Sequence, residues 1–316
     1  NASNESGFSA IPGGTRGSNG EYFYFSEIGF AWSSTSSNQT NAVNRAWKYN
    51  DAILNIFPNP NLKPEIGWSA EVGIKQGVKM GDWKGMIDLS GFVNNYENMI
   101  EFSFGFYNPM NGNQIDIYTS QGIAELANLQ QTYGYTIQQI IGFGAQNVEK
   151  ARISGVELSF NSTGKINDVE VVSLIGYTYM NPISLNNDPQ YTIYNSDSTT
   201  NMLKYRFKHL VRADIEAVYK AWGFGISCRY NSFMQNIDKV FEEPIAQNTY
   251  ILPGLKEYRK IYNKGNLVFD ARVSYKLNDT MKIGLIANNV FNTEYSSRPG
   301  DIQPPRNFLV QLSWKF

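Results

Sequence analysis

The chain has 316 residues and a mass of 35.7 kDa, of which 14% are aromatic and only 17% are charged. Soluble domains carry roughly 25% charged residues, and a net charge of −1 gives no bulk field that attracts nucleic acid. One cysteine and one histidine exclude a disulfide framework and a multi-cysteine metal centre, so we expect neither a metal site nor a cofactor. The mean hydropathy of −0.37 and the lack of any apolar run of about 18 residues exclude a membrane-spanning helix, but not a membrane β-barrel.

Alternation of apolar and polar residues dominates the chain. In segment 221–230 every even residue from Trp222 to Tyr230 is apolar, and the odd residues are small or polar. Residues two apart share one face of a strand, so this strand has an apolar and a polar side. The same period predicts ten strands, at residues 21–32, 65–75, 83–96, 151–161, 169–180, 211–220, 221–230, 267–276, 281–289 and 308–316.

Strand length and aromatic placement favour a membrane barrel. Strands of globular proteins average about 5–6 residues, whereas a tilted strand that crosses a membrane needs about 9–11. Several apolar faces end in an aromatic residue, such as Trp68, Trp222 or Tyr275, as the aromatic girdles of outer-membrane barrels do. A soluble β-sandwich, which buries its apolar face against a second sheet, remains an alternative.

Short and long connections alternate along the chain. The predicted tight turns lie at residues 77–82, 162–168, 220–221 and 277–280, and the predicted long polar loops at residues 97–150, 181–207, 231–265 and 290–307. Short periplasmic turns and long extracellular loops are typical of outer-membrane barrels. Helical spacing of apolar residues predicts one helix in the first loop, near Ser120–Thr132, with Ser120 as its cap.

The last strand is amphipathic and ends on an aromatic residue. Its apolar positions include Val310, Leu312, Trp314 and Phe316, which we interpret as a signal for the barrel assembly machinery. If this terminus lies in the periplasm, every predicted tight turn falls on the periplasmic side. An ordinary edge strand is the alternative interpretation.

Several short motifs resemble the C-terminal half of a TonB-dependent outer-membrane receptor. They are Asn59-Pro60-Asn61-Leu62-Lys63-Pro64-Glu65, the strand from Asn147 to Leu158, Tyr177-Thr178-Tyr179, and the closing region with Asn288-Asn289-Val290-Phe291-Asn292, Arg298-Pro299-Gly300 and Pro305-Arg306-Asn307-Phe308. The overall style, including segment 92–100, is closer to receptors of the type that contains a carboxypeptidase-like domain than to the classical siderophore receptors.

This resemblance implies a 22-stranded barrel around an N-terminal plug domain. Residues 1–316 would then be one part of that barrel domain, with ten or eleven strands and no plug. The family leaves room for one more strand between Trp32 and Asn59, where Asn38–Tyr49 shows no clear alternation. The implied partners are the TonB–ExbB–ExbD complex, the barrel assembly machinery, outer-membrane lipid and a surface lipoprotein.

Two groups of residues are candidates for the site. Charged residues on the polar faces are expected to line the barrel and contact the plug; they are Glu71, Arg212, Asp214, Glu216, Arg229, Asp270 and Arg272. Loop tyrosines are expected to contact the ligand; they are Tyr107, Tyr118, Tyr133, Tyr135 and Tyr262. Cys228 falls on an apolar face, where it is a small hydrophobic residue, and a structural role is favoured for His209.

The leading hypothesis is an outer-membrane transporter that imports a scarce chelate, glycan or peptide with energy from TonB, and that has no enzymatic activity. Two alternatives stay open. One is a complete small barrel, either a pore or a barrel hydrolase, although wet-face glycines such as Gly223 and Gly225 would fill its interior poorly. The other is a secreted β-sandwich adhesin.

Overall fold

The computed structural model describes residues 15–16, 22–23, 44–49, 52–59, 61–117, 119–186, 192, 194–244 and 250–315. Twelve strands form one sheet; they are β3 (Asn44–Tyr49), β4 (Ala52–Phe57), β5 (Ile66–Met80), β6 (Trp83–Tyr107), β7 (Gln114–Ile115), β8 (Ile141–Ile166), β9 (Val169–Ser184), β10 (His209–Tyr219), β11 (Trp222–Asn231), β12 (Asn266–Lys276), β13 (Met281–Asn288) and β14 (Asn307–Trp314). The short strands β1 (Thr15–Arg16) and β2 (Tyr22–Phe23) pair separately.

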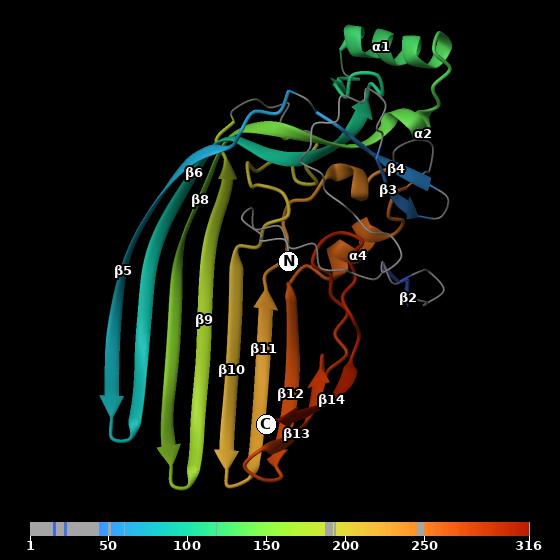
Figure 1. The fold of residues 1–316 in the computed structure, drawn as a ribbon. Coiled ribbons are helices and arrows are strands. Elements are labelled where there is room, and N and C mark those ends of the chain that lie inside the picture. Colours follow the sequence, from blue (N-terminus) through green and yellow to red (C-terminus); the bar gives the residue numbers. More distant parts are fainter. Residues whose placement is uncertain are drawn as a thin grey trace.

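Nine long strands form a curved wall in which each strand pairs with the next one along the chain. Their order is β5-β6-β8-β9-β10-β11-β12-β13-β14, and every pair is antiparallel. Figure 1 shows tight turns at the bottom of this wall and the long connections at its top. We refer to these two edges as the turn end and the loop end. Nine of the ten predicted strands are therefore confirmed, while most of the tenth, residues 21–32, lies outside the described residues.

Cross-strand register places the predicted apolar residues on one side of the wall. Ile226 of β11, for example, lies between Ile215 and Ala271 on the neighbouring strands. This apolar face is open, since Val72 is 77% exposed and Phe224 is 54% exposed. No second sheet covers it within the described part of the chain, so the sandwich alternative is wrong. Hydrophobic side chains in this number are stable on an open face only against hydrocarbon.

Two polar pairs on the apolar face make their hydrogen bonds within the pair. Ser162 and Ser173 are buried on adjacent strands, and their hydroxyls bond to each other at 2.7 Å. Near the loop end, the Nδ1 of His209 bonds to the Tyr177 hydroxyl at 2.9 Å, and its ring lies 5.2 Å from that of Tyr179. An unpaired polar group would be costly against hydrocarbon, so this mutual pairing is what the apolar face requires.

The predicted loop at 97–150 is partly strand, which corrects that prediction. β6 and β8 stay paired as far as Phe106 and Ile141, well past the other strands of the wall. We call these extensions, residues 97–107 and 141–150, the arm; Figure 1 shows them bending over the loop end. Phe104 and Phe143 meet edge to face at 5.1 Å across the arm. Aromatic packing therefore holds a segment whose overall polar composition suggested a loop.

The tip of the arm carries the predicted helix. The helix α1 spans Ser120–Gln131, but its cap is Thr119, whose hydroxyl accepts a hydrogen bond from the Gly122 amide at 3.0 Å. Ser120 is therefore the first helical residue and not the cap. The other helices are α2 (Ile137–Ile140), the 3-10 helix η2 (Lys239–Phe241) and α4 (Leu255–Ile261). Among the described residues, no helix is long and apolar enough to cross a membrane.

The described part of the region without clear alternation, residues 44–49, forms a hairpin with residues 52–57 at the loop end. β3 and β4 pair with each other, and β4 runs parallel to the arm, with Asn55 opposite Gly142. The Asn55 side chain is buried and donates to the carbonyl of Ile141 at 3.0 Å. This hairpin is part of the loop end and not a further strand of the wall.

Candidate functional site

The loop end is a packed assembly, which we call the cap. It consists of the arm and the described parts of three connections: residues 185–186, 192 and 194–208 after β9, residues 232–244 and 250–265 after β11, and residues 289–306 after β13. Figure 1 shows all four at the same end of the wall. Their contacts decide whether the loop end is a set of separate loops or one unit.

A buried ion pair joins the first two connections. The Lys204 ammonium lies 2.6 Å from an Asp238 carboxylate oxygen, and the two side chains are only 7% and 4% exposed. The Tyr205 hydroxyl donates to the other oxygen of Asp238. Burial, followed by the nearby Asp238 charge, raises the pKa of the Tyr205 phenol, which stays protonated as a donor. Breaking a buried pair leaves an uncompensated charge, so this pair fixes the two connections together.

A buried asparagine adds a second link between the same connections. Asn236 is 0% exposed, and its amide nitrogen donates to the Met202 carbonyl at 2.9 Å. Its side-chain oxygen accepts from the Asp197 backbone amide at 2.9 Å, and its carbonyl accepts from the Tyr205 amide at 2.8 Å. Buried polar groups that are all satisfied specify one arrangement of the backbone.

The arm packs onto this linked pair of connections. Met99 and Leu203 share one buried cluster, and the rings of Phe143 and Phe241 stack at 5.9 Å. Glu101 of the arm keeps one buried carboxylate oxygen without a hydrogen-bond partner. Burial raises the pKa of Glu101, although the charges of Lys204 and Arg206 oppose this shift. The arm and the first two connections therefore form one unit, and Arg298 of the third connection lies 5.6 Å from the Tyr205 ring of the first.

The bend of the arm is held by two of the sequence motifs. The Asn147 side chain donates to the carbonyls of Lys63 and Asn98, at 2.9 and 2.8 Å, and accepts from the Lys63 amide at 2.8 Å. Glu65 accepts from the Ile100 amide at 2.6 Å. Asn98 itself has a φ of +55°, in the left-handed region that asparagine tolerates better than most residues. Both motifs thus have a local structural role at the place where β6 and β8 leave the wall.

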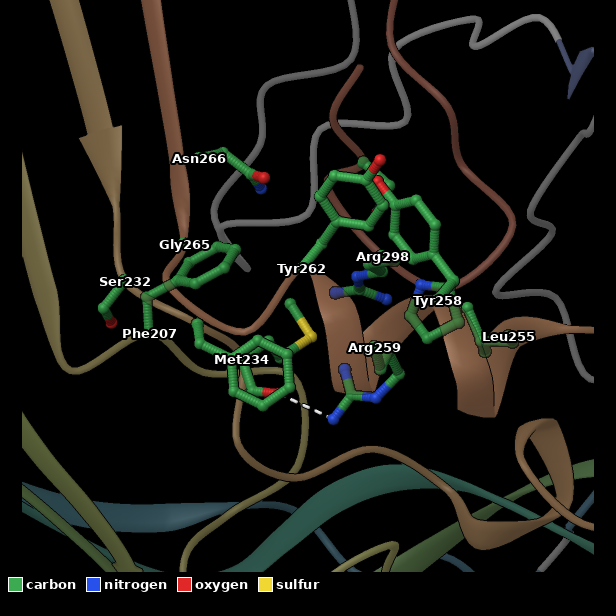
Figure 2. Close-up of a pocket in the computed structure, with 13 residues that line it drawn as sticks. Phe207, Ser232, Met234, Leu255, Tyr258, Arg259, Tyr262, Gly265, Asn266 and Arg298 are labelled. Carbon is green, nitrogen blue, oxygen red and sulfur yellow. Dashed lines mark hydrogen bonds between the residues drawn. The ribbon is translucent and has the colours of Figure 1, made fainter. Parts of the chain in front are cut away.

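A small pocket lies among the three connections, mainly between the second and the third. Figure 2 shows Tyr258, Tyr262, Arg259 and Met234 around it, and further lining residues are Phe207, Ser232, Phe233, Leu255, Gly265, Asn266, Ser296, Arg298 and Pro299. Its cavity volume is about 50 Å³, whereas sites for small molecules measure about 300–1,000 Å³. The pocket therefore has room only for water-sized molecules.

The cations of the pocket are already engaged. The Arg259 guanidinium donates to the carbonyl of Met234 at 2.9 Å, pairs with Glu242 at 2.5 Å and lies 4.5 Å from the ring of Phe233. A ligand that used Arg259 would have to displace these contacts. Binding of a larger ligand therefore requires rearrangement of the cap.

The predicted tyrosines fall in different environments. Tyr262 is 60% exposed at the pocket, 4.6 Å from Tyr258, and Tyr133 is 55% exposed beside α1. Tyr107 is fully buried, stacks on Phe57 at 4.9 Å and donates to the Ser103 carbonyl, so its ring is not available at the surface. Tyr135 packs against the cluster of Leu129. Tyr118 lies outside the described residues.

The predicted charged residues lie on the polar face of the wall, and the structure brings some of them together. Arg272 pairs with Asp214 and Glu216, each at 2.7 Å. Arg229 and Asp270 make a longer contact of 3.3 Å. Arg212 and Glu71 make no ion pair among the described residues.

Two features of the site were not predicted from the sequence. A β-carbon on Gly225 would lie 2.4 Å from the Arg272 guanidinium carbon, so this glycine makes room for the arginine and does not leave a hole. Lys204, Asn236 and Asp238 lie in predicted polar loops, where only their burial distinguishes them.

At the last strand, Val310, Leu312 and Trp314 do project from the apolar face, while Phe316 lies outside the described residues.

The wall, with one face for hydrocarbon, a charged opposite face, short turns at one end and a packed cap at the other, defines a partial outer-membrane β-barrel. The family described as TonB dependent receptor-like, beta-barrel matches residues 11–290. The chain belongs to this family.

Several solved structures are similar to the chain. One is the ferric-catecholate import receptor Fiu of Escherichia coli K12, with 17% identity, a TM-score of 0.49 and coverage of 98% of this chain and 34% of that one. Others are the siderophore receptor PirA of Acinetobacter baumannii (15%, 0.49, 84% and 34%) and the outer-membrane transporter YddB of E. coli (14%, 0.49, 83% and 34%). The chain spans about a third of the length of these structures.

Proposed function

We propose that the chain is part of the barrel domain of an outer-membrane active transporter. In this proposal the cap captures a scarce ligand outside the cell, and the TonB–ExbB–ExbD complex supplies the energy for its import. Family membership supports this function. A transport role also accounts for the arrangement of the chain, which has charges on the inner face, hydrophobic residues on the outer face and a cap at the loop end. The proposed role is binding and translocation, without a catalytic step.

The single observation that carries the proposal is the closed cap. The Lys204–Asp238 pair joins the first two connections, the arm packs on them through Met99 and Leu203, and Arg298 of the third connection lies 5.6 Å from the Tyr205 ring. The pocket among the connections is too small for a ligand of ordinary size. A transporter needs such a gate to open for ligand, whereas a passive pore needs an unobstructed mouth. Chelates, glycans and peptides all remain candidate ligands, because aromatic and polar loop residues suit each of them.

The polar face of the wall is proposed to contact a plug domain. Arg212 is exposed and lies directly opposite Arg229, so two like charges face each other. Like charges directly opposite destabilise a strand pair. A carboxylate from a plug would relieve this repulsion. Reversing the charge with Arg212→Glu should therefore impair uptake or plug seating.

The test uses the full-length protein in its native outer membrane. Residues 101–144 would be replaced by a two-residue turn, which removes most of the arm together with α1 and α2 and leaves the wall strands paired. We expect loss of ligand binding and uptake, with normal insertion of the barrel. Uptake that survives this deletion, or an intact mass near 35.7 kDa together with a stable pore conductance, would instead support the small-barrel alternative.

A further inference from the structure

A second pocket lies at the turn end of the wall, far from the cap. It is formed by the β10–β11 turn, the β12–β13 turn and the end of β14. Gly223, Ser274 and Ser313 line it, so it opens on the polar face. Its cavity volume is about 330 Å³, which lies within the range of real binding sites. Capture at the cap assigns no role to this pocket.

The pocket has an excess of positive charge. Four lysines and one aspartate line it: Lys220, Lys276, Lys282, Lys315 and Asp279. Lys276 pairs with Asp279 at 2.6 Å. The other three lysines make no ion pair in the described part of the chain, and Lys282 lies directly opposite Lys276. Like charges in that position repel each other, so the pocket favours an anionic occupant.

Lys220 has a left-handed backbone conformation, which favours glycine or asparagine over lysine. The first residue of the β5–β6, β8–β9 and β10–β11 turns has a positive φ: +61° at Gly81, +52° at Asn167 and +54° at Lys220. Glycine and asparagine adopt this conformation readily, but a lysine is strained there. The two other turns have residues that suit this position, Gly81 and Asn167. What Lys220 adds is its charge at the edge of the pocket, where its ammonium lies 5.0 Å from the centre of the Tyr219 ring.

The backbone holds the three segments in fixed positions. The Lys276 amide donates to the Ala221 carbonyl at 2.8 Å, and the Lys315 amide donates to the Thr280 carbonyl at 2.8 Å. Within the β12–β13 turn, the Asn278 side-chain oxygen accepts from the Met281 amide at 2.8 Å. The lysine backbones are therefore positioned before any partner arrives, which lowers the entropic cost of binding.

From this arrangement we propose that the pocket binds a peptide segment that carries several carboxylates. The lysines come from three separate segments, so a single small anion neutralises only part of the charge, whereas successive acidic side chains can reach all three. A lipid headgroup is disfavoured, because the acyl chains belong with Phe224 and Ile226 on the opposite face, of which only the rim residues Trp222 and Met281 reach the pocket lining. Hydroxyl groups of Ser274, Thr280 and Ser313 in the lining suit a peptide backbone.

The experiment is zero-length cross-linking of the full-length protein in native outer membranes. A water-soluble carbodiimide condenses a carboxylate with a lysine amine that touches it; the amide forms and the reagent takes up the water lost. Mass spectrometry then identifies the linked peptides. We expect Lys282 and Lys315 to be linked to aspartate or glutamate of a segment outside β10–β14. Links to Asp279 alone, or none, would overturn the proposal.

Variants test whether the charge of the pocket is the cause. Lys282→Gln combined with Lys315→Gln should abolish the cross-links of the remaining Lys220, and high salt should weaken them in the wild type. Lys84→Gln is the matched control, because Lys84 is a rim lysine of the β5–β6 hairpin that also faces a lysine, Lys79, across its strand pair. Its substitution should leave the links unchanged. Protection of Lys282 from acetylation by phosphatidylglycerol vesicles, without any peptide cross-link, would show a lipid site instead and refute the proposal. Uptake is not measured, so this result is independent of the transport function.

Discussion

The wall and the cap differ in which side chains they expose: the wall exposes hydrophobic residues, and the cap buries polar ones. On the wall, large hydrophobic residues such as Val72 and Phe224 are exposed and polar residues face inward. In the cap, Asn236 and Asp238 are buried, at 0% and 3% exposure, and hydrogen bonds join segments distant in sequence. The wall is stabilised by ladder hydrogen bonds between neighbouring strands and by its hydrocarbon surroundings. The cap depends on a few buried polar contacts, so it should be the part that opens first.

The largest effect is expected in the cap. Asp238→Ala removes the partner of Lys204 and leaves a buried ammonium, which should cost the cap about 3–5 kcal/mol. Hydrogen exchange of the full-length protein should then accelerate in residues 194–206 and 231–244, while the wall amides stay protected. Asp279→Ala is the control, since its ion pair is exposed. Equal acceleration in wall and cap would refute the idea that they open separately.

A charge on the apolar face should have the next largest effect, and it separates the two faces of the wall. Val72→Arg, near the middle of β5, should destabilise the barrel by about 2–4 kcal/mol in lipid. Unfolding in vesicles by urea measures this free energy. The neighbouring substitution Glu71→Arg places the same charge on the polar face and should cost much less. Equal costs would show that our assignment of the faces is wrong.

A smaller effect is expected within the polar face. Arg272→Gln leaves Asp214 and Glu216 without their shared partner, which should cost about 1–2 kcal/mol because the groups are partly exposed. The same urea experiment applies. Arg229→Gln, whose single contact is long and half-exposed, serves as the comparison and should cost less. A larger loss for Arg229 would mean that the Arg272 network has little energetic weight.

The smallest effect concerns a surface ion pair of the cap. The hydrogen bond from Lys256 lowers the pKa of Glu243 below its ordinary 4.5, and the same bond raises the pKa of Lys256 above its ordinary 10.5. The pair therefore stabilises the folded cap between these limits; its contribution is lost as pH falls through the lowered pKa of Glu243 or rises through the raised pKa of Lys256. Carboxyl ¹³C NMR of Glu243 should show the lowered midpoint, which Lys256→Gln should move back upward. An unchanged midpoint in that variant would contradict the assignment.

The wall could be predicted from the sequence because its physics is local. Alternation from Trp222 to Tyr230 reports the two faces directly, and the tight turns at Lys220–Ala221 and Leu277–Thr280 set which strands are neighbours. The same alternation predicted the last two strands, β13 and β14.

The cap could not be predicted, because its contacts are long-range and polar. Lys204 and Asp238 are 34 residues apart, and nothing in their immediate sequence indicates burial. The continuation of β6 and β8 into the arm depends on tertiary packing of Phe104 on Phe143. The room that Gly225 leaves for Arg272 likewise depends on the register of two strands and not on either sequence alone.

The neighbour-only order of the wall has a consequence for how the protein reaches this state. Each hairpin can pair with the hairpin already formed. Only short loops close at the turn end, so the entropic cost of loop closure in each step is low. The Lys204–Asp238 contact spans β10 and β11, so it can form only after that hairpin has brought its two stems together. The cap therefore acquires its final packing only after the strands have inserted. In a partly inserted chain, the extracellular connections are not yet joined by this ion pair.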